Sequence, residues 1–375
     1  MRLALYGGSF DPPHAGHVCL AKAAVSALKA DKLLIIPNFL QPHKEPTENG
    51  PAPEERLELC RLAFEGIDGA QVSDIEVRRG GKSYTADTVE ALRAQYPGAE
   101  LVLVLGADAA ESLPRWHRYE EVLKSLPVAV AARAGEAVPE GMTALACDAP
   151  DVSSRELCKL LKAGGGAELM DGRVYARIIQ NRWYGAKPSL PWLREQAYAM
   201  LKPKRVSHVQ GCEQLAVKLA RLHGADEYDA AVSAILHDIT KKLSHDEQLL
   251  LCEKYGIILH SEELASPQII HQMTGAAAAR ELFGVPEHIE RAIRYHTTGR
   301  PNMTKLEKIL YLADCLEPTR SFAGIDAMRR AAEEDLDAAM ALVLTDMLKY
   351  IEKSGFRLYS GTVEALNWYK RQGEK

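Results

Sequence analysis

Two histidines near the start of the chain are spaced for joint contact with one phosphate group. His14 and His17 lie in GGSFDPPHAGH, which follows the apolar run at residues 3–6. Side chains three residues apart project from one face of a helix. Glycines before a helix also let backbone amides approach an anion at the helix N-terminus. The pattern predicts a triphosphate site where both imidazoles donate hydrogen bonds to charge developing on phosphorus.

A second group of side chains, in the C-terminal half, combines histidine and aspartate at the ends of apolar stretches. His237 and Asp238 end the run at residues 230–236, and Asp314 follows the run at residues 309–313. Such groups are costly to bury unless they are paired or bind a metal, and together they suit a transition metal. This half contains eight histidines, so spacing alone leaves a metal site and ordinary polar positions equally open.

The elements that must position the first site alternate between strand-like and helical stretches up to about residue 184. Continuous apolar runs, typical of parallel strands covered on both faces, occur at residues 3–6, 33–36, 101–105 and 128–131. The stretches between them are long enough for crossover helices. The pattern predicts an α/β domain with a doubly wound, Rossmann-like parallel sheet.

The second half has a different character, with apolar residues at helical spacing and no alternating strand pattern, which predicts an all-α domain. Gly185, Pro188 and Pro191 lie between the two halves and favour a linker. We therefore expect one domain over residues 1–186, a linker over 187–193 and a second domain over 194–375.

Length and composition fit this division. The 375 residues exceed one ordinary domain, and a net charge of -5 argues against general affinity for nucleic acid. The start carries no signal-peptide pattern, and no stretch approaches the ~20 apolar residues of a membrane span. The seven cysteines form no CxxC pair, so each is interpreted as a small buried thiol. We expect a cytoplasmic protein without nucleic-acid or membrane partners, and a homo-oligomer stays open.

The first segment resembles the (H/T)xGH signature of the nucleotidyltransferase superfamily, in its nicotinate-nucleotide adenylyltransferase version. The resemblance covers nearly all of residues 1–184. Further elements follow in the family order: PHK at residues 42–44, SYTADT at 83–88, GAD at 106–108, and Trp116 with Arg118. Each element alone is more often structural, but four in order make chance agreement improbable.

The resemblance implies transfer of AMP from ATP to nicotinate mononucleotide, with Mg²⁺ accompanying the triphosphate, to give nicotinate adenine dinucleotide and pyrophosphate. Residues 83–88 would frame the nicotinate carboxylate, and Trp116 would stack on the pyridine ring. The expected catalytic residues are His14, His17 and Lys44. The expected substrate-binding residues are Gly7, Gly8, Ser9, Phe10, His43, Tyr84, Thr85, Asp87, Gly106, Asp108, Trp116, Arg118, Ser153, Ser154 and Arg155.

The last family element departs from its pattern. The family sequence resembles ISSTxIR, whereas residues 152–158 read VSSRELC. Arg155 therefore stands at the threonine position and Cys158 at the arginine position. Both lie on one face at the start of a helix, so our hypothesis is that Arg155 supplies the displaced charge.

The order H…HD…H…H…D, with Lys241 and the segment HTTG at residues 296–299, resembles the HD phosphohydrolase superfamily in its symmetrical diadenosine-tetraphosphatase branch. The match runs from about Arg194 to beyond residue 345. It implies two divalent metals, commonly iron, that share Asp238. The first would also take His208, His237 and Asp314, and the second His271 and His296. Asp238 and Lys241, which would contact phosphate, are the expected catalytic residues of this half. Thr297 and Arg320 would bind substrate, and diadenosine tetraphosphate would yield two ADP.

Three alternatives stay open. The C-terminal half could be a regulatory module that binds a nucleotide without hydrolysing it, although its complete ligand set argues against a retired site. It could act on another phosphoester. The N-terminal half could use nicotinamide mononucleotide, because only the family resemblance favours the acid.

Overall fold

The protein is described from a computed structural model that covers residues 1–42, 45, 47–132, 138–148 and 152–373. His43 and Lys44, expected in the first site, lie outside the described residues. The chain divides into two compact units, Met1–Pro188 and Ser189–Lys375. Among the helices of the described residues, none combines the length and apolar character that a membrane crossing requires.

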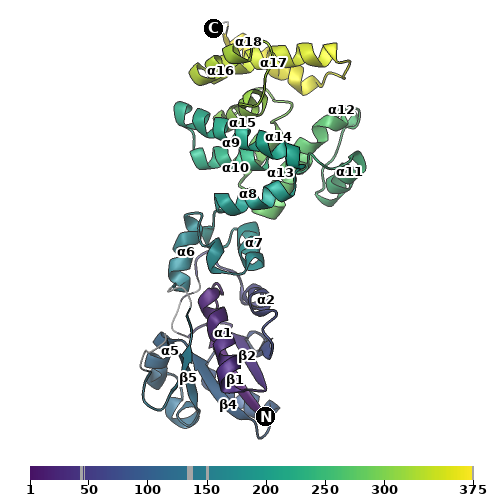
Figure 1. The fold of residues 1–375 in the computed structure, drawn as a ribbon. Helices are drawn as coiled ribbons and strands as arrows, with labels where there is room; N and C mark the ends of the chain where they lie inside the picture. The colour runs from purple at the N-terminus through teal and green to yellow at the C-terminus, as the bar shows by residue number, and fades with distance from the viewer. Residues whose placement is uncertain (43–44, 46, 133–137, 149–151, 374–375) are drawn as a thin grey trace. The chain divides into compact units, whose positions relative to one another are not determined.

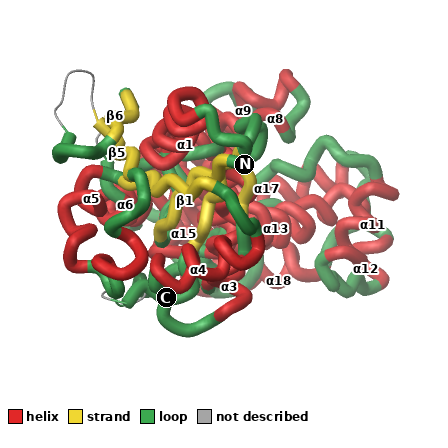
Figure 2. Tube along the Cα trace, turned by 90° about the horizontal axis from the view of Figure 1, so that it is seen from below, coloured by secondary structure: helices red, strands yellow, loops and turns green. Residues whose placement is uncertain are grey.

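The first unit is built on a six-stranded parallel sheet with the order β3-β2-β1-β4-β5-β6. The strands are β1 (Arg2–Gly8), β2 (Lys32–Pro37), β3 (Ala70–Val72), β4 (Glu100–Leu105), β5 (Val128–Ala132) and β6 (Thr143–Ala146). Yellow segments in Figure 2 mark this sheet. The predicted doubly wound α/β fold is confirmed, and the four predicted apolar runs lie in β1, β2, β4 and β5.

The remaining strands, β3 and β6, escape the sequence pattern because they are short edge strands with exposed residues. The helices of this unit are α1 (Ala15–Leu28), α2 (Pro53–Phe64), α3 (Ile75–Arg79), α4 (Thr85–Gln95), α5 (Ala107–Ser112), α6 (Ser154–Lys162) and α7 (Gly172–Asn181). The strand order reverses between β1 and β4, and ligands of such sheets bind at the carboxyl ends of the strands at this reversal. Helix α1 begins there, directly after β1 (Figure 1).

The regular secondary structure of the second unit is all helical within its described residues, as predicted. Its helices are α8 (Leu190–Ala199), α9 (Pro203–His223), α10 (Glu227–Leu236), α11 (His245–Lys254), α12 (Ser261–Leu264), α13 (Ile270–Phe283), α14 (Glu287–Arg294), α15 (Lys305–Leu316), α16 (Ile325–Glu334), α17 (Leu336–Lys353) and α18 (Ser360–Gly373). Helices α9, α10, α13, α14 and α15 pack around one apolar core (Figure 1).

Within the stretch expected to be a linker, residues 190–193 form the first turn of α8. Pro191 is compatible with a first helical turn, where its missing N–H has no intrahelical partner. The hydroxyl of Ser189 caps the helix by accepting from the backbone N–H of Trp192.

Candidate active sites

The first site lies where β1 passes into α1. His14 is the extended residue directly before α1, and its backbone N–H donates to Nδ1 of His17 at 3.2 Å. Because Nδ1 of His17 accepts, a neutral His17 carries its proton on Nε2 and can donate from there. The two rings face each other with centroids 3.8 Å apart. The predicted pair on one helical turn is therefore present, with a defined donor on His17.

Glycine at position 16 makes room for the first histidine. A Cβ built on Gly16 would lie 3.1 Å from Nδ1 of His14. That nitrogen is buried and has no hydrogen-bond partner among the described residues. A buried polar atom without a partner is costly, so this nitrogen is available to a ligand.

Both imidazoles are neutral at neutral pH. Burial lowers the pKa of His14 to about 4. Burial also holds the pKa of His17 well below its ordinary range, and the neighbouring His14 adds to this shift. These residues therefore offer N–H donors rather than full positive charges.

A buried arginine on α2, which the sequence analysis missed, holds the loop that carries this site. Nη1 of Arg56 donates to the carbonyl oxygen of Ser9 at 2.7 Å, and Nη2 donates to those of Asn38 and Phe39 at 2.8 and 2.9 Å. It thus joins the loop after β1 to the loop after β2. Most of its partners are backbone carbonyls, with the side-chain oxygen of Asn38 as a further acceptor at 3.2 Å, and backbone partners cannot be recognised in the sequence.

The glycine-rich segment is otherwise only partly available to a ligand. Gly7 is exposed, and Gly8 and Ser9 are half-buried. The ring of Phe10 is 1% exposed and packs edge-on against His17 and Phe64. The ring of Phe10 is therefore closed off by the protein and lies against His17.

The altered last element lies at the start of α6, beside the first loop. The hydroxyl of Ser154 lies 3.4 Å from the carbonyl oxygen of Pro12, and Ser153 caps the helix together with Glu156. Arg155 is exposed and has no hydrogen bond or ion pair with described residues. Burial raises the pKa of the Cys158 thiol to about 11, and the Asp11 carboxylate contributes. A thiol rather than a cation therefore lies near Asp11.

The segment 83–88 meets the segment 116–118. The ring centroids of Tyr84 and His117 lie 4.5 Å apart. Nη2 of Arg118 donates to the carboxylates of Glu90 and Glu121 at 2.6 and 2.7 Å. Asp87 lies 3.6 Å from Arg118. Arg118 is thus saturated by protein carboxylates, and a phosphate would have to compete with them.

The other expected residues of this region lie at helix starts and against the core. Thr85 opens α4, Gly106 precedes α5 after β4, and Asp108 is exposed in the first turn of α5. Trp116 is half-buried, and its indole N–H donates to the Ser112 hydroxyl at 3.0 Å. One edge of its ring is therefore already fixed by the protein.

The second site gathers side chains from five parts of the helical unit. His208 lies on α9, His237 and Asp238 follow α10, His271 lies on α13, His296 follows α14, and Asp314 lies on α15. The structure thus brings together all six residues expected as metal ligands.

Each of the four histidines has its Nδ1 tied to an acceptor of the protein. The acceptors are Glu317 Oε1 at 3.1 Å for His208, Ala234 O at 2.7 Å for His237, Gln268 O at 2.9 Å for His271, and Ile293 O at 2.7 Å for His296. An Nδ1–H donor leaves the lone pair of a neutral imidazole on Nε2. Four Nε2 lone pairs therefore converge on the interior of the site.

The Asp238 carboxylate lies between two groups of these nitrogens. Its Oδ2 is 3.3 Å from Nε2 of His237 and 4.0 Å from that of His208. Its Oδ1 is 3.4 Å from Nε2 of His271 and 3.7 Å from that of His296. Oδ1 of Asp314 lies 3.0 Å from Nε2 of His208, on the first side. One carboxylate thus faces two separate donor sets.

The donor set fits bound cations. Nε2 of His237 and Oδ1 of Asp238 are buried without a hydrogen-bond partner among the described residues. Nε2 of His271 and Nε2 of His296 lie 3.2 Å apart. Their lone pairs repel each other, and a bound cation would remove this repulsion. Imidazole and carboxylate ligands suit a divalent transition metal.

Comparison with known proteins bears on both units. Residues 5–160 match a family described as cytidylyltransferase-like, and residues 205–319 match the HD domain. A probable nicotinate-nucleotide adenylyltransferase of Exiguobacterium sibiricum is 39% identical over 48% of this chain and 96% of its own length. A symmetrical bis(5'-nucleosyl)-tetraphosphatase of Halalkalibacterium halodurans is 37% identical over 46% of this chain and 95% of its own length.

The chain therefore belongs to the nicotinate-nucleotide adenylyltransferase family through its first unit and to the HD-domain family of symmetrical tetraphosphatases through its second. A Mycoplasma pneumoniae protein named probable nicotinate-nucleotide adenylyltransferase/Ap4A hydrolase is 26% identical over 91% of this chain and 97% of its own length. A solved structure from Clostridium acetobutylicum, described as a predicted HD superfamily hydrolase involved in NAD metabolism, is 34% identical, with a TM-score of 0.48 over 50% of this chain and all of that one. The predicted fusion is confirmed, and the HD unit is a divalent-metal-binding domain.

Three cationic side chains border the HD site. Nε of Arg205 donates to Oδ2 of Asp238 at 2.5 Å, Nζ of Lys241 lies 3.0 Å from Nε2 of His271, and Nη2 of Arg320 donates to Oδ1 of Asp314 at 3.3 Å. Positive charge beside a carboxylate-rich centre suits a polyphosphate substrate. Sequence analysis missed Arg205, whose spacing from His208 carries no specific signal.

A threonine and a glutamine shape the rim of the HD site near His296. The hydroxyl of Thr297 lies 3.1 Å from Nε2 of His296 and 3.2 Å from that of His271. Oε1 of the buried Gln272 accepts from the backbone N–H groups of Thr297 and Thr298, each at 3.2 Å. Gln272 thereby fixes this segment, although its sequence position gave no indication of the role.

A glycine of α9 lets Glu317 reach His208. A Cβ on Gly211 would lie 2.5 Å from Oε2 of Glu317. The absence of a side chain at position 211 therefore allows the carboxylate that orients the His208 ring to approach α9.

We expect acid to destabilise the first unit through His14. The unfolded chain takes up a proton near pH 6.5, whereas folded His14 does so only near pH 4. The contribution of His14 to the free energy of unfolding is therefore complete above pH 6.5 and decreases as the pH falls towards 4. The free energy of unfolding differs between pH 7 and pH 5, and His14→Asn should reduce this difference by about 1–2 kcal/mol. The measurement is hydrogen exchange of β1 amides, corrected for intrinsic exchange rates. The exposed His245→Asn serves as control, and an unchanged pH dependence in His14→Asn would contradict the assignment.

Gly211→Ala should weaken metal binding without unfolding the HD unit. The added methyl group displaces the flexible end of Glu317 and so frees the His208 ring. Loss of such an orienting partner lowers metal affinity about 10–100-fold. Titration with Co²⁺ measures the affinity, and Glu317→Gln should reproduce the loss. Wild-type affinity in both variants would show that this carboxylate does not support the site.

Proposed function

We propose that the first unit transfers AMP from ATP to nicotinate mononucleotide, and that the second hydrolyses diadenosine tetraphosphate symmetrically to two ADP. The near full-length Mycoplasma relative, whose name joins these two activities, supports the combination. All three substrates, ATP, nicotinate mononucleotide and diadenosine tetraphosphate, are small nucleotides. The cytoplasmic location, the absence of nucleic-acid partners and the oligomeric state stay predictions from the sequence.

For the first unit, the observation that carries the proposal is the pair of neutral imidazoles at the N-terminus of α1. The helix N-terminus offers backbone N–H groups and partial positive charge to a triphosphate. His17 donates from Nε2, as its bond from the His14 amide dictates. Mg²⁺ bound with ATP would neutralise phosphate charge. The mononucleotide phosphate attacks the α-phosphorus in line and pyrophosphate leaves, so the protein supplies position and hydrogen bonds.

The nicotinate half of the first site is proposed to lie around residues 83–88 and 106–118. Helix α4 starts at Thr85 and α5 at Ala107, so each start presents backbone N–H groups that a carboxylate can use. This arrangement favours the acid over nicotinamide mononucleotide. Arg155, exposed and unpaired among described residues, is the cation that we propose replaces the family arginine at position 158.

Replacing His17 should abolish most adenylyl transfer while the fold is kept. Loss of one donor to developing charge costs about 10²–10³-fold in kcat. The assay is pyrophosphate release at saturating ATP and nicotinate mononucleotide. Lys22→Ala, an exposed position on the same helix, is the matched control and should keep normal turnover. His17→Ala with wild-type kcat would refute the role.

For the second unit, the carrying observation is that all four histidines are tied through Nδ1 and present Nε2 to two carboxylates. We propose that the first metal is held by His208, His237, Asp238 and Asp314, and the second by Asp238, His271 and His296, with iron as the expected metal. Such ions, when bound, lower the pKa of water to give a nucleophile at neutral pH. Lys241, Thr297 and Arg320 would hold the polyphosphate.

Asp238→Ala should lose both metals and hydrolysis together, because its two oxygens face the two donor sets. Lys241→Ala should keep the metals and lose most hydrolysis, since its amine borders the site without being a ligand. Lys242→Ala, whose amine donates to the carbonyl oxygen of Ala199 outside the site, is the matched control. Elemental analysis and chromatography of ADP are the measurements, and adenylyl transfer should survive all three changes.

The first two alternatives are separated by the same measurements, and the third by the kinetics of adenylyl transfer. Two bound metals without release of ADP from diadenosine tetraphosphate would indicate a regulatory module or another phosphoester substrate. Absence of metal after anaerobic loading with iron or manganese would refute the metallohydrolase. Equal kcat/KM for nicotinamide and nicotinate mononucleotides would remove the proposed preference of the first unit.

A further inference from the structure

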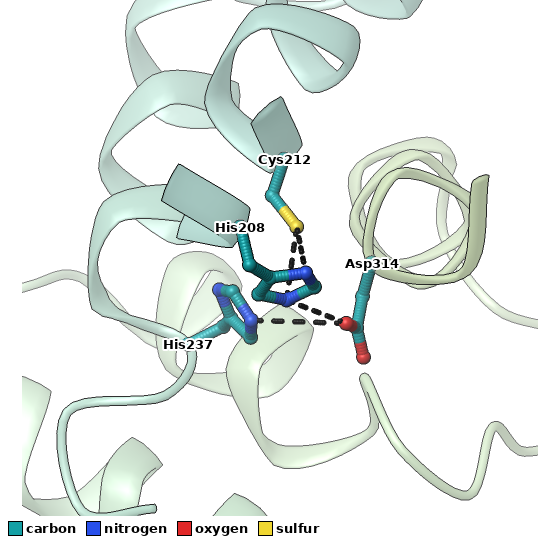
Figure 3. A group of neighbouring side chains, drawn as sticks. All are labelled: His208, Cys212, His237 and Asp314. Atoms are coloured by element: carbon teal, nitrogen blue, oxygen red, sulfur yellow. Dashed lines mark hydrogen bonds and ion pairs between the residues drawn. The ribbon is translucent and has the colours of Figure 1, made fainter. Parts of the chain in front are cut away.

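A cysteine lies inside the first donor set of the HD unit. Cys212 and His208 are four residues apart on α9, so they share one face of the helix. The Cys212 sulfur lies 3.3 Å from Nε2 of His208. Figure 3 shows both side chains directed towards the same space as His237 and Asp314. Donor atoms of these four residues all lie within 4.8 Å of one another.

This position differs from the interpretation of every cysteine as a small buried thiol. Cys212 is fully buried, as that interpretation requires, but its neighbours are an imidazole nitrogen and carboxylates rather than apolar groups alone. A structural role would be a weak S–H bond to Nε2 of His208. That bond would leave Nε2 of His237 buried and unpartnered beside it, whereas a cation among the four donors accounts for both atoms.

We propose that Cys212 is a ligand of the metal held by His208, His237 and Asp314. The inference rests on the metal site of the proposed function and deepens it. On binding, the thiol loses its proton to solvent and the sulfur becomes a thiolate donor. The two metal positions then differ in kind, because the position shared by His271 and His296 has no sulfur in its donor set among the described residues.

A thiolate ligand has a consequence for metal choice. Soft sulfur donors favour zinc or ferrous iron, whereas carboxylate and water ligands suit manganese and magnesium. The first position should therefore discriminate against manganese more strongly than the second. Cys212→Val keeps the volume and apolar character of the position but removes the donor, and Cys212→Ser substitutes a harder oxygen.

The test is X-ray absorption and electronic spectroscopy of the full chain loaded anaerobically with Co²⁺ or Zn²⁺. The wild type should show a metal–sulfur distance of about 2.3 Å for zinc and a thiolate-to-cobalt charge-transfer band. Both signals should vanish in Cys212→Val and Cys212→Ser, and the preference for zinc over manganese should fall roughly tenfold. Cys252→Val, a buried cysteine on α11, should keep them.

The outcomes distinguish this inference from the function on which it rests. Two bound metals without a sulfur signal in the wild type would overturn the role of Cys212 and leave the metallohydrolase intact. A sulfur signal that persists in folded Cys212→Val and Cys212→Ser would also overturn it. Failure of the wild type to bind any metal would overturn both proposals.

Discussion

The HD site depends on one constraint: an imidazole can offer a lone pair at Nε2 only if its proton is kept on Nδ1. Here every participating ring meets this condition through a bond to the protein. His237, His271 and His296 each use the carbonyl oxygen three residues earlier in the chain. The orientation of these rings is therefore determined within a single local turn. Tertiary packing has only to bring the turns together, and the shared core of α9, α10, α13, α14 and α15 does so.

In the adenylyltransferase site the tautomer of His17 is also fixed at Nδ1, but by a different kind of partner. The His17 tautomer is set by a backbone N–H instead of a carbonyl, so its Nε2 becomes a donor rather than an acceptor. The same residue type thus presents an N–H donor in one unit and a nitrogen lone pair in the other. What differs is the group bonded to Nδ1.

The fold and the gathering of the six histidine and aspartate side chains could be predicted because each is marked by a local sequence pattern. Apolar runs identify β1, β2, β4 and β5, and the spacing of histidines and aspartates resembles a known family. Edge strands β3 and β6 carry no such pattern. Arg56, Gln272 and Glu317 act through backbone groups or through partners distant in sequence, so their roles require the structure.

One interpretation of the sequence changed for a physical reason. Cys212 was expected to be an inert buried thiol. Burial was correct, yet helical spacing from His208 puts the sulfur among polar donors.

The arginine of α2 has a wider consequence. Because Arg56 bonds to carbonyl oxygens after β1 and after β2, the two loops share one rigid support. Ordering a flexible segment at the moment of association consumes conformational entropy and weakens affinity. A loop that is already held loses less on meeting its nucleotide. More of the free energy of association is then available to stabilise the transition state, because less of it is lost in ordering the loop.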